Sequence, residues 1–328
     1  MRGPHWWLII TLALSIVVVS GVAAAPTWGK LPQVGVLDPG HAPGGFCLTG
    51  FQQGLHDLGY VEGQTIAIEY RFTEGNPDRL RALAADLVQR TPDVLWTHSP
   101  PAAQATKQAT TTIPIVVAVS SDLVAQGLAA GLAQPGGNLT GFELRDIELL
   151  GKRLELLKEA VPMIAHVAVL VDPAARAHDR VPSNIEAEAH ALGVQLQRVE
   201  AGSPDVFEGA FAAMVQGRAE ALIIMDVPVF ALHRHRLLEL ARLHRLPTVS
   251  GTRFFAEAGS LLAYGANVYD LCRRSAVYVD KILKGTKPTE LPVEQPTKFE
   301  LVINLKTAQA LGLTLPPSIL FQADEVIK

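Results

Sequence analysis

The chain has 328 residues, of which 48% are hydrophobic and 18% are charged, and its formal net charge is −4. The charges occur in short mixed runs without a basic stripe, which argues against nucleic acid as a partner. A chain of this length can bury two separate cores, so we expect two lobes.

The N-terminal segment predicts export. Residues 1–25 combine a basic start, an apolar run over Leu8–Val19 and small residues at Ala23–Ala25. The run is shorter than the roughly 20 residues that cross a bilayer, and the nearest cysteine, Cys47, is too distant to carry a lipid anchor. We therefore expect a signal peptide over residues 1–25, cleavage near Ala25, and a soluble mature protein in the periplasm.

Short apolar runs alternate with amphipathic helical patterns in the first half of the chain. Strands are expected at Gln33–Leu37, Thr65–Tyr70, Asp93–Thr97 and Pro114–Val119, and helices at Phe46–Leu58, at Asp78–Gln89, from near Pro101 and from near Leu123. Strands that alternate with helices in this way build a parallel sheet that helices cover on both faces.

The same pattern then repeats at an offset of about 130 residues, which indicates one α/β unit used twice. Its strands are expected at Ala165–Val171, Val194–Glu200, Ala221–Met225 and Pro247–Ser250. Surplus elements are a strand at Leu139–Leu144, a helix at Ile147–Val161, and, at the end, a strand at Leu261–Gly265, a helix at Val268–Leu283 and a strand at Phe299–Asn304.

These elements predict the lobe boundaries. The first lobe is expected to comprise residues 31–141 with about 267–304, and the second lobe residues 142–266 with about 305–328. Gly141 and Gly265 are the predicted hinge-adjacent positions, because glycine tolerates the backbone changes that a crossing between lobes must absorb.

Polar residues follow the predicted strands, where open parallel sheets bind their ligands. The candidate ligand-binding residues are Asp38, Ser99, Ser120, Ser121 and Asp122 in the first lobe and Asp226, Arg253 and Tyr264 in the second. Hydroxyls and helix N–H groups can hold a carboxylate, and an aspartate can hold an ammonium, so the set suits an amino acid or a similar small zwitterion. The alternative for each serine or aspartate is a helix cap, and for Asp122 both roles stay open.

Several strings carry a family resemblance: GLHDLGYVEGQTIAIEYRFTEGNPDRL, KQATTTIPIVV, LAQPGGNLTG, GKRLELLKEAVP and YVDKILKGTKPTELPVEQPTKFELVINLKTAQALGL. In order, they resemble the ABC transporter substrate-binding protein family from about Gln33 to Val326. The resemblance implies an α/β type I periplasmic-binding-protein fold, with two Rossmann-like lobes, three crossings, and a small-molecule ligand that passes to a permease in the inner membrane. It does not name the ligand, because members differ in what they bind.

Other chemistry finds little support. Nucleotide, zinc-protease and serine-hydrolase motifs are missing, so we expect no enzyme activity, no cofactor and no metal site. His233, His235 and His244 share one predicted helix with several arginines, which is typical of a solvated basic face. Cys47 and Cys272 could form one bridge, but we expect two separate buried thiols. We expect a monomeric solute-binding protein; the alternatives are a ligand-binding sensory module and a secreted enzyme.

Overall fold

The computed structural model describes residues 31–40, 45–144, 146–174 and 185–328. The predicted signal peptide, residues 1–25, lies outside the described residues. Within the described ranges, no helix combines the length and the apolar character that a bilayer crossing requires.

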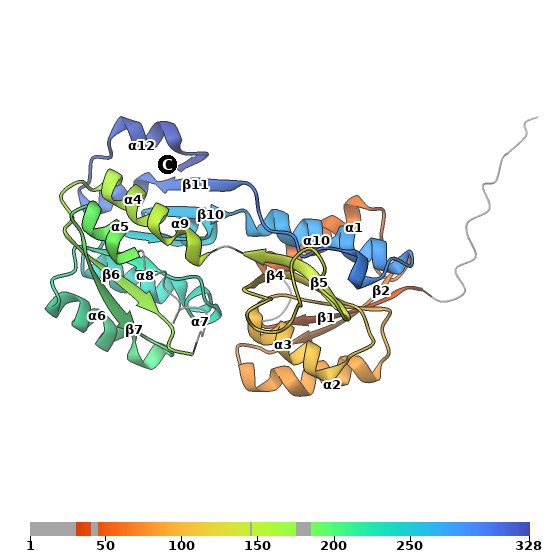
Figure 1. Ribbon diagram of the computed structural model, residues 1–328. Coiled ribbons are helices and arrows are strands. Elements are labelled where there is room, and N and C mark those ends of the chain that lie inside the picture. The colour runs from red at the N-terminus through yellow and green to blue at the C-terminus, as the bar shows by residue number, and fades with distance from the viewer. Residues whose placement is uncertain (1–30, 41–44, 145, 175–184) are drawn as a thin grey trace, which may run out of the picture. The chain divides into compact units, whose positions relative to one another are not determined.

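Among the described residues, the first sheet has five parallel strands in the order β2-β1-β3-β4-β5 (Figure 1). Their bounds are β1 Gln33–Asp38, β2 Ala67–Phe72, β3 Val94–Thr97, β4 Ile115–Ser121 and β5 Leu139–Leu144. Both faces are covered, because alternate residues of β1, β3 and β4 enter different cores. Val34 and Val36 pack with helices α1 (Phe46–Asp57) and α10 (Val268–Leu283), whereas Leu37 packs with α2 (Leu80–Gln89) and α3 (Pro100–Ala109).

In the described part of the chain, the second sheet has seven strands in the order β12-β11-β10-β9-β8-β6-β7 (Figure 1). Their bounds are β6 His166–Val171, β7 Gln195–Glu200, β8 Ala221–Ile224, β9 Thr248–Ser250, β10 Leu262–Ala266, β11 Phe299–Asn304 and β12 Glu325–Ile327. All neighbours are parallel except β10 and β11.

Helices cover both faces of the second sheet as well. Val167 and Val169 of β6 enter a core that includes α4 (Leu150–Ala160), α5 (Ile185–Ala191), α11 (Leu305–Leu311) and α12 (Pro317–Gln322). Ala168 and Leu170 enter the other core, with α6 (Phe207–Gln216), α7 (Pro228–Leu232), α8 (Arg234–Leu243) and α9 (Arg253–Ala258). The repeated α/β unit that the sequence predicts is confirmed by this duplication of layers.

Two predicted elements need correction. The segment after β4 forms turns rather than a helix from near Leu123, because Asp122 has a left-handed φ of 54° and the Leu123 amide donates to the Glu143 carboxylate instead of entering a helix. Phe299–Asn304 belongs to the second sheet, not to the first lobe, because β11 pairs with β10 and β12. The predicted lobe boundary at about residue 304 is therefore too late.

The two predicted hinge glycines lie inside strands. A Cβ atom on Gly141 of β5, where φ is 143°, would lie 1.9 Å from the Val117 carbonyl oxygen. A Cβ atom on Gly265 of β10 would lie 1.8 Å from the Gly251 carbonyl oxygen. Close backbone approach therefore requires glycine at both positions, whatever they contribute to a crossing.

The cysteine prediction was wrong. Cys47 of α1 and Cys272 of α10 form a disulfide, with Cα atoms 5.2 Å apart. The two helices pack closely because Gly50 and Gly54 face α10, where a Cβ on Gly54 would lie 2.1 Å from the Arg273 carbonyl oxygen. Sequence alone could not place these cysteines together, since 225 positions separate them.

Candidate functional site

Parallel pairing brings the first five candidate residues to one edge of the first sheet. Asp38 ends β1, Ser99 follows β3, and Ser120, Ser121 and Asp122 lie at the end of β4. The strand register thus confirms that these residues share the carboxyl edge, where such sheets bind ligands.

Asp38 is buried and already has partners. Its Oδ1 accepts a 2.7 Å hydrogen bond from the Gly40 amide and lies 3.4 Å from Nε2 of His98. Burial alone would raise the pKa of Asp38, but the hydrogen bond and charge of His98, together with the Gly40 amide, hold the pKa below its ordinary value. Asp38 is therefore an ionised carboxylate beside a histidine, which the sequence did not single out.

Ser99 combines backbone strain with an unused hydroxyl. Its φ is 73°, an uncommon value for a residue with a side chain, and its buried Oγ has no hydrogen-bond partner among the described residues. The serine precedes α3 but does not cap it with its side chain. Pro100 and Pro101 follow directly and lack N–H groups, so this helix start offers fewer donors to an anion than expected.

The end of β4 is held mainly by internal contacts. Asp122 Oδ1 accepts a 3.2 Å hydrogen bond from the Ala125 amide, so Asp122 caps the following turn. The carbonyl of Ser121 accepts a bond from Gln126, and Ser120 is buried with its Oγ 3.5 Å from the Ser121 carbonyl oxygen. Of the two open roles for Asp122, the capping role is present.

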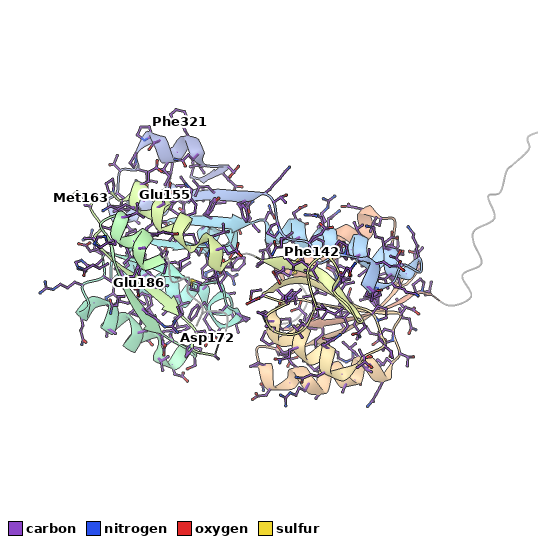
Figure 2. All side chains as sticks on the ribbon, in the orientation of Figure 1. Phe142, Glu155, Met163, Asp172, Glu186 and Phe321 are labelled. Carbon is purple, nitrogen blue, oxygen red and sulfur yellow. A yellow bond between two sulfur atoms is a disulfide. The ribbon has the colours of Figure 1, made fainter. Side chains whose placement is uncertain are left out.

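Polar residues also follow the strands of the second sheet. Asp172 follows β6 (Figure 2), where its Oδ1 accepts a 2.9 Å hydrogen bond from the Ala174 amide. Ser250 ends β9, and its Oγ is fully buried without a hydrogen-bond partner in the described part of the chain. Each sheet therefore has, at its carboxyl edge, a serine hydroxyl without a hydrogen-bond partner among the described residues.

Asp226 follows β8 and belongs to a buried ionic cluster. Its Oδ1 accepts a 3.0 Å bond from the Thr252 hydroxyl, and its Oδ2 lies 3.6 Å from Nη2 of Arg153. The same Arg153 nitrogen donates to Asp146 Oδ1. Burial and the neighbouring Asp146 charge raise the pKa of Asp226 to about 8, although Arg153 and Thr252 act in the opposite direction.

Tyr264 contributes its backbone to this cluster. Its carbonyl oxygen accepts a 2.9 Å hydrogen bond from Nε of Arg153, while its ring lies 6.2 Å from the Phe299 ring. Asp226 and Tyr264, two of the sequence candidates, thus meet at Arg153.

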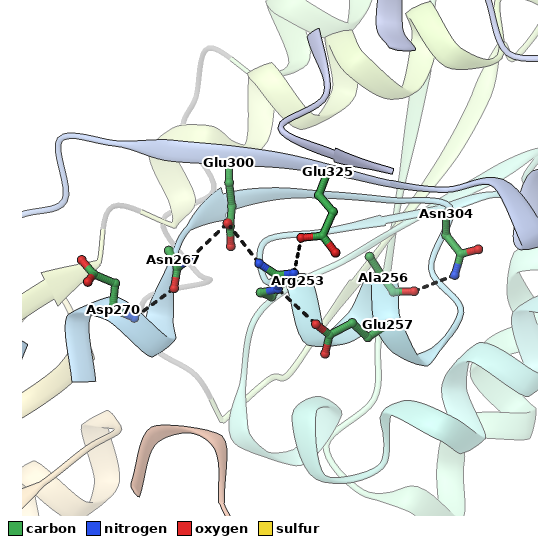
Figure 3. Close-up of polar contacts among 8 residues, drawn as sticks. All are labelled: Arg253, Ala256, Glu257, Asn267, Asp270, Glu300, Asn304 and Glu325. Carbon is green, nitrogen blue, oxygen red and sulfur yellow. Dashed lines mark hydrogen bonds and ion pairs between the residues drawn. The ribbon is translucent and has the colours of Figure 1, made fainter. Parts of the chain in front are cut away.

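Arg253 starts α9 and is surrounded by carboxylates (Figure 3). Its Nε donates 3.1 Å to Glu257, its Nη2 donates 2.5 Å to Glu325, and its Nη1 lies 3.5 Å from Glu300. Burial raises the pKa of Glu300, although the charge of Arg253 lowers it. The guanidinium is therefore already neutralised within the second sheet.

Aromatic side chains also gather at these strand ends. The Phe46 ring, from the start of α1, lies 5.8 Å from the Phe254 ring of α9 and 5.6 Å from the Tyr269 ring of α10, in edge-to-face geometry. Arg234 stacks over Phe254, with its guanidinium carbon 5.7 Å from the ring centre. The three rings follow β1, β9 and β10 respectively, so they share the carboxyl edges with the polar residues.

Among the residues that the structure describes, no group of three or more histidine, cysteine, aspartate or glutamate side chains is placed to hold a metal ion.

Comparison with known families decides the class of this protein. Residues 42–327 match the family described as ABC transporter substrate binding protein. The chain belongs to this family. It is a solute-binding protein and not an enzyme, as the sequence predicts.

Relatives of this substrate-binding protein include proteins described as binding amino acids. It is 26% identical over 270 residues to a tyrosine-binding protein from Clostridioides difficile (strain R20291), covering 80% of this chain and 76% of that protein. The crystal structure of an ABC domain in complex with L-Trp from Streptococcus pneumonia is 25% identical, with a TM-score of 0.83 over 91% of this chain and 100% of that chain.

Two further structures support the fold. A conserved domain protein from Vibrio cholerae is 27% identical, with a TM-score of 0.83 over 90% of this chain and 100% of that one. A glucose-galactose binding protein from Geobacillus stearothermophilus has a TM-score of 0.59 at 13% identity over 84% of this chain and 98% of that one, a likeness of fold alone. The predicted two-lobed α/β fold is confirmed.

Sequence reasoning missed the centre of the ionic cluster of this binding protein. Arg153 occupies a core-facing position of α4, one turn from the buried Leu150 and Leu157, and its side chain is 1% exposed. An arginine on the apolar stripe of a leucine-rich helix was the available signal, because a buried charge requires partners. His98, Ser250 and the three aromatic rings carried no comparable pattern.

Proposed function

We propose that this substrate-binding protein captures an aromatic amino acid at the carboxyl edges of its two sheets. The observation that supports this proposal most directly is a pair of buried serine hydroxyls, Ser99 Oγ and Ser250 Oγ, which have no hydrogen-bond partner among the described residues. A buried unsatisfied polar group costs about 1–3 kcal/mol, and the left-handed backbone of Ser99 adds to that cost. A ligand that hydrogen-bonds these hydroxyls would offset it.

The polar groups of the first edge suit the backbone of an amino acid. Ser99, Ser120 and Ser121 carry hydroxyls for the ligand carboxylate, and the ionised Asp38, with free lone pairs beyond its present bonds, suits the ammonium. Asp122, which already caps a turn, would assist as a second negative charge.

The proposed preference for an aromatic ligand rests on the aromatic side chains that lie at the same sheet edges. Phe46, Phe254 and Tyr269 form one edge-to-face cluster, which has the geometry to pack against another ring. The relatives described as binding tyrosine and L-Trp support this ligand class.

The second lobe plays a more structural part in this proposal. Asp226, Arg253 and Tyr264 would shape the second edge rather than neutralise the ligand, because Asp226 lies beside Arg153 in the buried cluster, Arg253 already holds internal ion pairs, and Tyr264 uses its carbonyl within the cluster. Ser250 would supply the direct polar contact from this lobe.

Transport completes the proposal. The strand pairing supports a first lobe of residues 31–144 with about 267–294 and a second lobe of about 146–266 with 299–328. Ligand binding would close the lobes about the three crossings, since a ligand shifts the equilibrium toward the state that it binds more tightly. The protein would act as a monomer in the periplasm and deliver its ligand to an ABC permease in the inner membrane.

A ligand screen tests this function. A thermal-shift series with L-Trp, L-Tyr and L-Phe, against glycine, glucose and adenosine, should show stabilisation by aromatic amino acids only; saturation at a hundredfold excess over Kd is worth about 2.7 kcal/mol. Calorimetry would then give Kd for Ser99→Ala and Ser250→Ala, each expected to bind about tenfold more weakly.

Thr112→Ala is the matched control, because Thr112 is an exposed hydroxyl at the amino end of β4, the opposite edge of the first sheet. It should retain full affinity. Stabilisation by glucose or adenosine alone would contradict the ligand class, and unchanged affinity in both serine variants would contradict the site.

A further inference from the structure

Glu143 is a buried glutamate near the carboxyl end of β5, the strand beside β4 in the first sheet (Figure 1). Its Oε2 accepts a 2.6 Å hydrogen bond from the Leu123 amide, and its Oε1 accepts a 3.0 Å hydrogen bond from Nε2 of Gln295. Burial of a carboxylate without hydrogen-bond donors is costly, so these two bonds favour one fixed position of the side chain. The carboxylate therefore joins two segments that are far apart in the sequence.

The first bond fixes the end of β4, where three of the candidate ligand-binding residues lie. The pairing of β4 with β5 shifts register between Val117 and Ser120, so that Ser120 lies opposite Glu143. Two residues further on, the backbone of Asp122 is left-handed, with a φ of 54°. The Leu123 amide that follows then donates to Glu143 instead of entering a helix. The Glu143 carboxylate thus holds the turn at which β4 ends.

The end of β4 also positions Ser99. The Ser99 amide donates a 2.7 Å hydrogen bond to the carbonyl oxygen of Val119, which lies within the register shift of β4. Ser99 is the first-sheet serine whose buried hydroxyl has no hydrogen-bond partner among the described residues. A displacement of the β4 end would therefore change the position of Ser99 as well as that of Ser120.

The second bond of the carboxylate reaches the third crossing between the sheets. The segment before Gln295 runs along β5, where Glu294 pairs with Phe142. The Glu143 amide donates a 2.9 Å hydrogen bond to the Glu294 carbonyl oxygen, which fixes this segment on the first sheet. β11 of the second sheet begins at Phe299, four residues after Gln295. Glu143 therefore contacts the crossing at the point where the chain leaves the first sheet.

We propose that Glu143 is a positioning residue for ligand capture, because its carboxylate couples the end of β4 to the third crossing through Gln295. The inference rests on the proposed function, which places the ligand at the carboxyl edge of this sheet. A conformation of the crossing that keeps the Gln295 bond also keeps the β4 end in place. A ligand that holds the β4 end favours that conformation in return, because coupling between two sites is reciprocal.

An exchange of the side chains at positions 143 and 295 tests this coupling. Gln295→Glu places a second carboxylate against Glu143, so the bond between them is lost and the two charges repel. Glu143→Gln/Gln295→Glu restores a complementary pair, because the amide at position 143 accepts from Leu123 and donates to the carboxylate at position 295. Gln89→Glu is the matched control, since it makes the same change at an exposed position at the end of α2.

Hydrogen exchange of the ligand-free full chain measures the position of the β4 end without a ligand. The Leu123 amide should exchange several-fold faster in Gln295→Glu than in the wild-type protein, because the repelled Glu143 carboxylate no longer stays on this amide. The double variant and Gln89→Glu should exchange at the wild-type rate. An unchanged rate in Gln295→Glu, or a double variant that exchanges as fast as Gln295→Glu, overturns the inference.

Calorimetry with L-Trp and L-Tyr tests the consequence for capture. Gln295→Glu should bind about threefold to tenfold more weakly, whereas the double variant and Gln89→Glu should bind like the wild type. A purely structural bond would lower the free energy of unfolding in urea and leave the affinity of the folded protein unchanged, and this result overturns the role of Glu143 in capture. If neither amino acid binds to any of these proteins, the proposed function fails, while exchange at Leu123 still decides whether Glu143 couples the β4 end to the crossing.

Discussion

Removal of the Cys47–Cys272 disulfide should strongly reduce the stability of the protein. The bridge closes a loop of 225 residues, for which the chain-entropy relation gives about 5 kcal/mol of destabilisation of the unfolded state. Buried side chains of α1 and α10 besides the two cysteines share one core, so the folded structure should persist without the bridge while its free energy of unfolding falls by about 3–5 kcal/mol.

Urea unfolding of the oxidised protein, the reduced protein and Cys47→Ser/Cys272→Ser measures this effect. The two bridge-free forms should share one lowered midpoint and a steeper dependence on urea, because their unfolded chains are less compact. The double variant should not respond to reductant, which controls for side effects of the reagent. Equal midpoints for the oxidised and reduced protein would refute the reasoning, and so would two alkylatable thiols in the untreated protein.

Three further changes have calculable effects. Gly54→Ala should lower the free energy of unfolding by about 1–3 kcal/mol, measured with urea, because the added methyl group would meet the backbone of α10. Gly209→Ala on α6, where the methyl group would enter open space, should leave the free energy of unfolding unchanged or raise it. Equal effects of the two would contradict the packing argument. The pKa of Asp38 is lowered in the folded protein, so its ionised carboxylate adds to the free energy of unfolding above about pH 4, and this contribution is lost as pH falls through the folded-state pKa. Asp38→Asn should therefore make the free energy of unfolding less sensitive to acid pH, and an unchanged pH dependence would refute this. Trp96→Phe removes the 2.8 Å hydrogen bond from the indole Nε1 to the Ser275 hydroxyl and should lower the free energy of unfolding by about 1–3 kcal/mol in the same urea assay. An unchanged free energy of unfolding would contradict a stabilising role for this bond.

Much of the fold was predictable because local patterns in the sequence determine where its strands and helices form. The β-branched runs and amphipathic stretches located β5, α10 and β11 at the residues that the structure gives them, and their repetition predicted the second sheet. The shared edge of Asp38, Ser99 and Ser120 followed as well, because parallel strands of one sheet end on the same side.

The sequence alone could not predict which distant segments pair with each other. Nothing local distinguishes a β11 that joins the second sheet from one that returns to the first, since either partner would satisfy its backbone hydrogen bonds. The disulfide likewise depends on the contact of α1 with α10, which glycines make possible only once both helices lie on the first sheet.

The chemistry of the site divides in the same way. Residue types and their order along the chain determined which side chains reach the strand ends, and this part could be read from the sequence. Burial and partners decided what those side chains do: three carboxylates surround Arg253, Asp226 lies beside Arg153, and the Ser99 hydroxyl has no partner within the described ranges. Charge compensation and desolvation depend on distances of a few ångströms between segments far apart in the chain, and only the tertiary structure sets those distances.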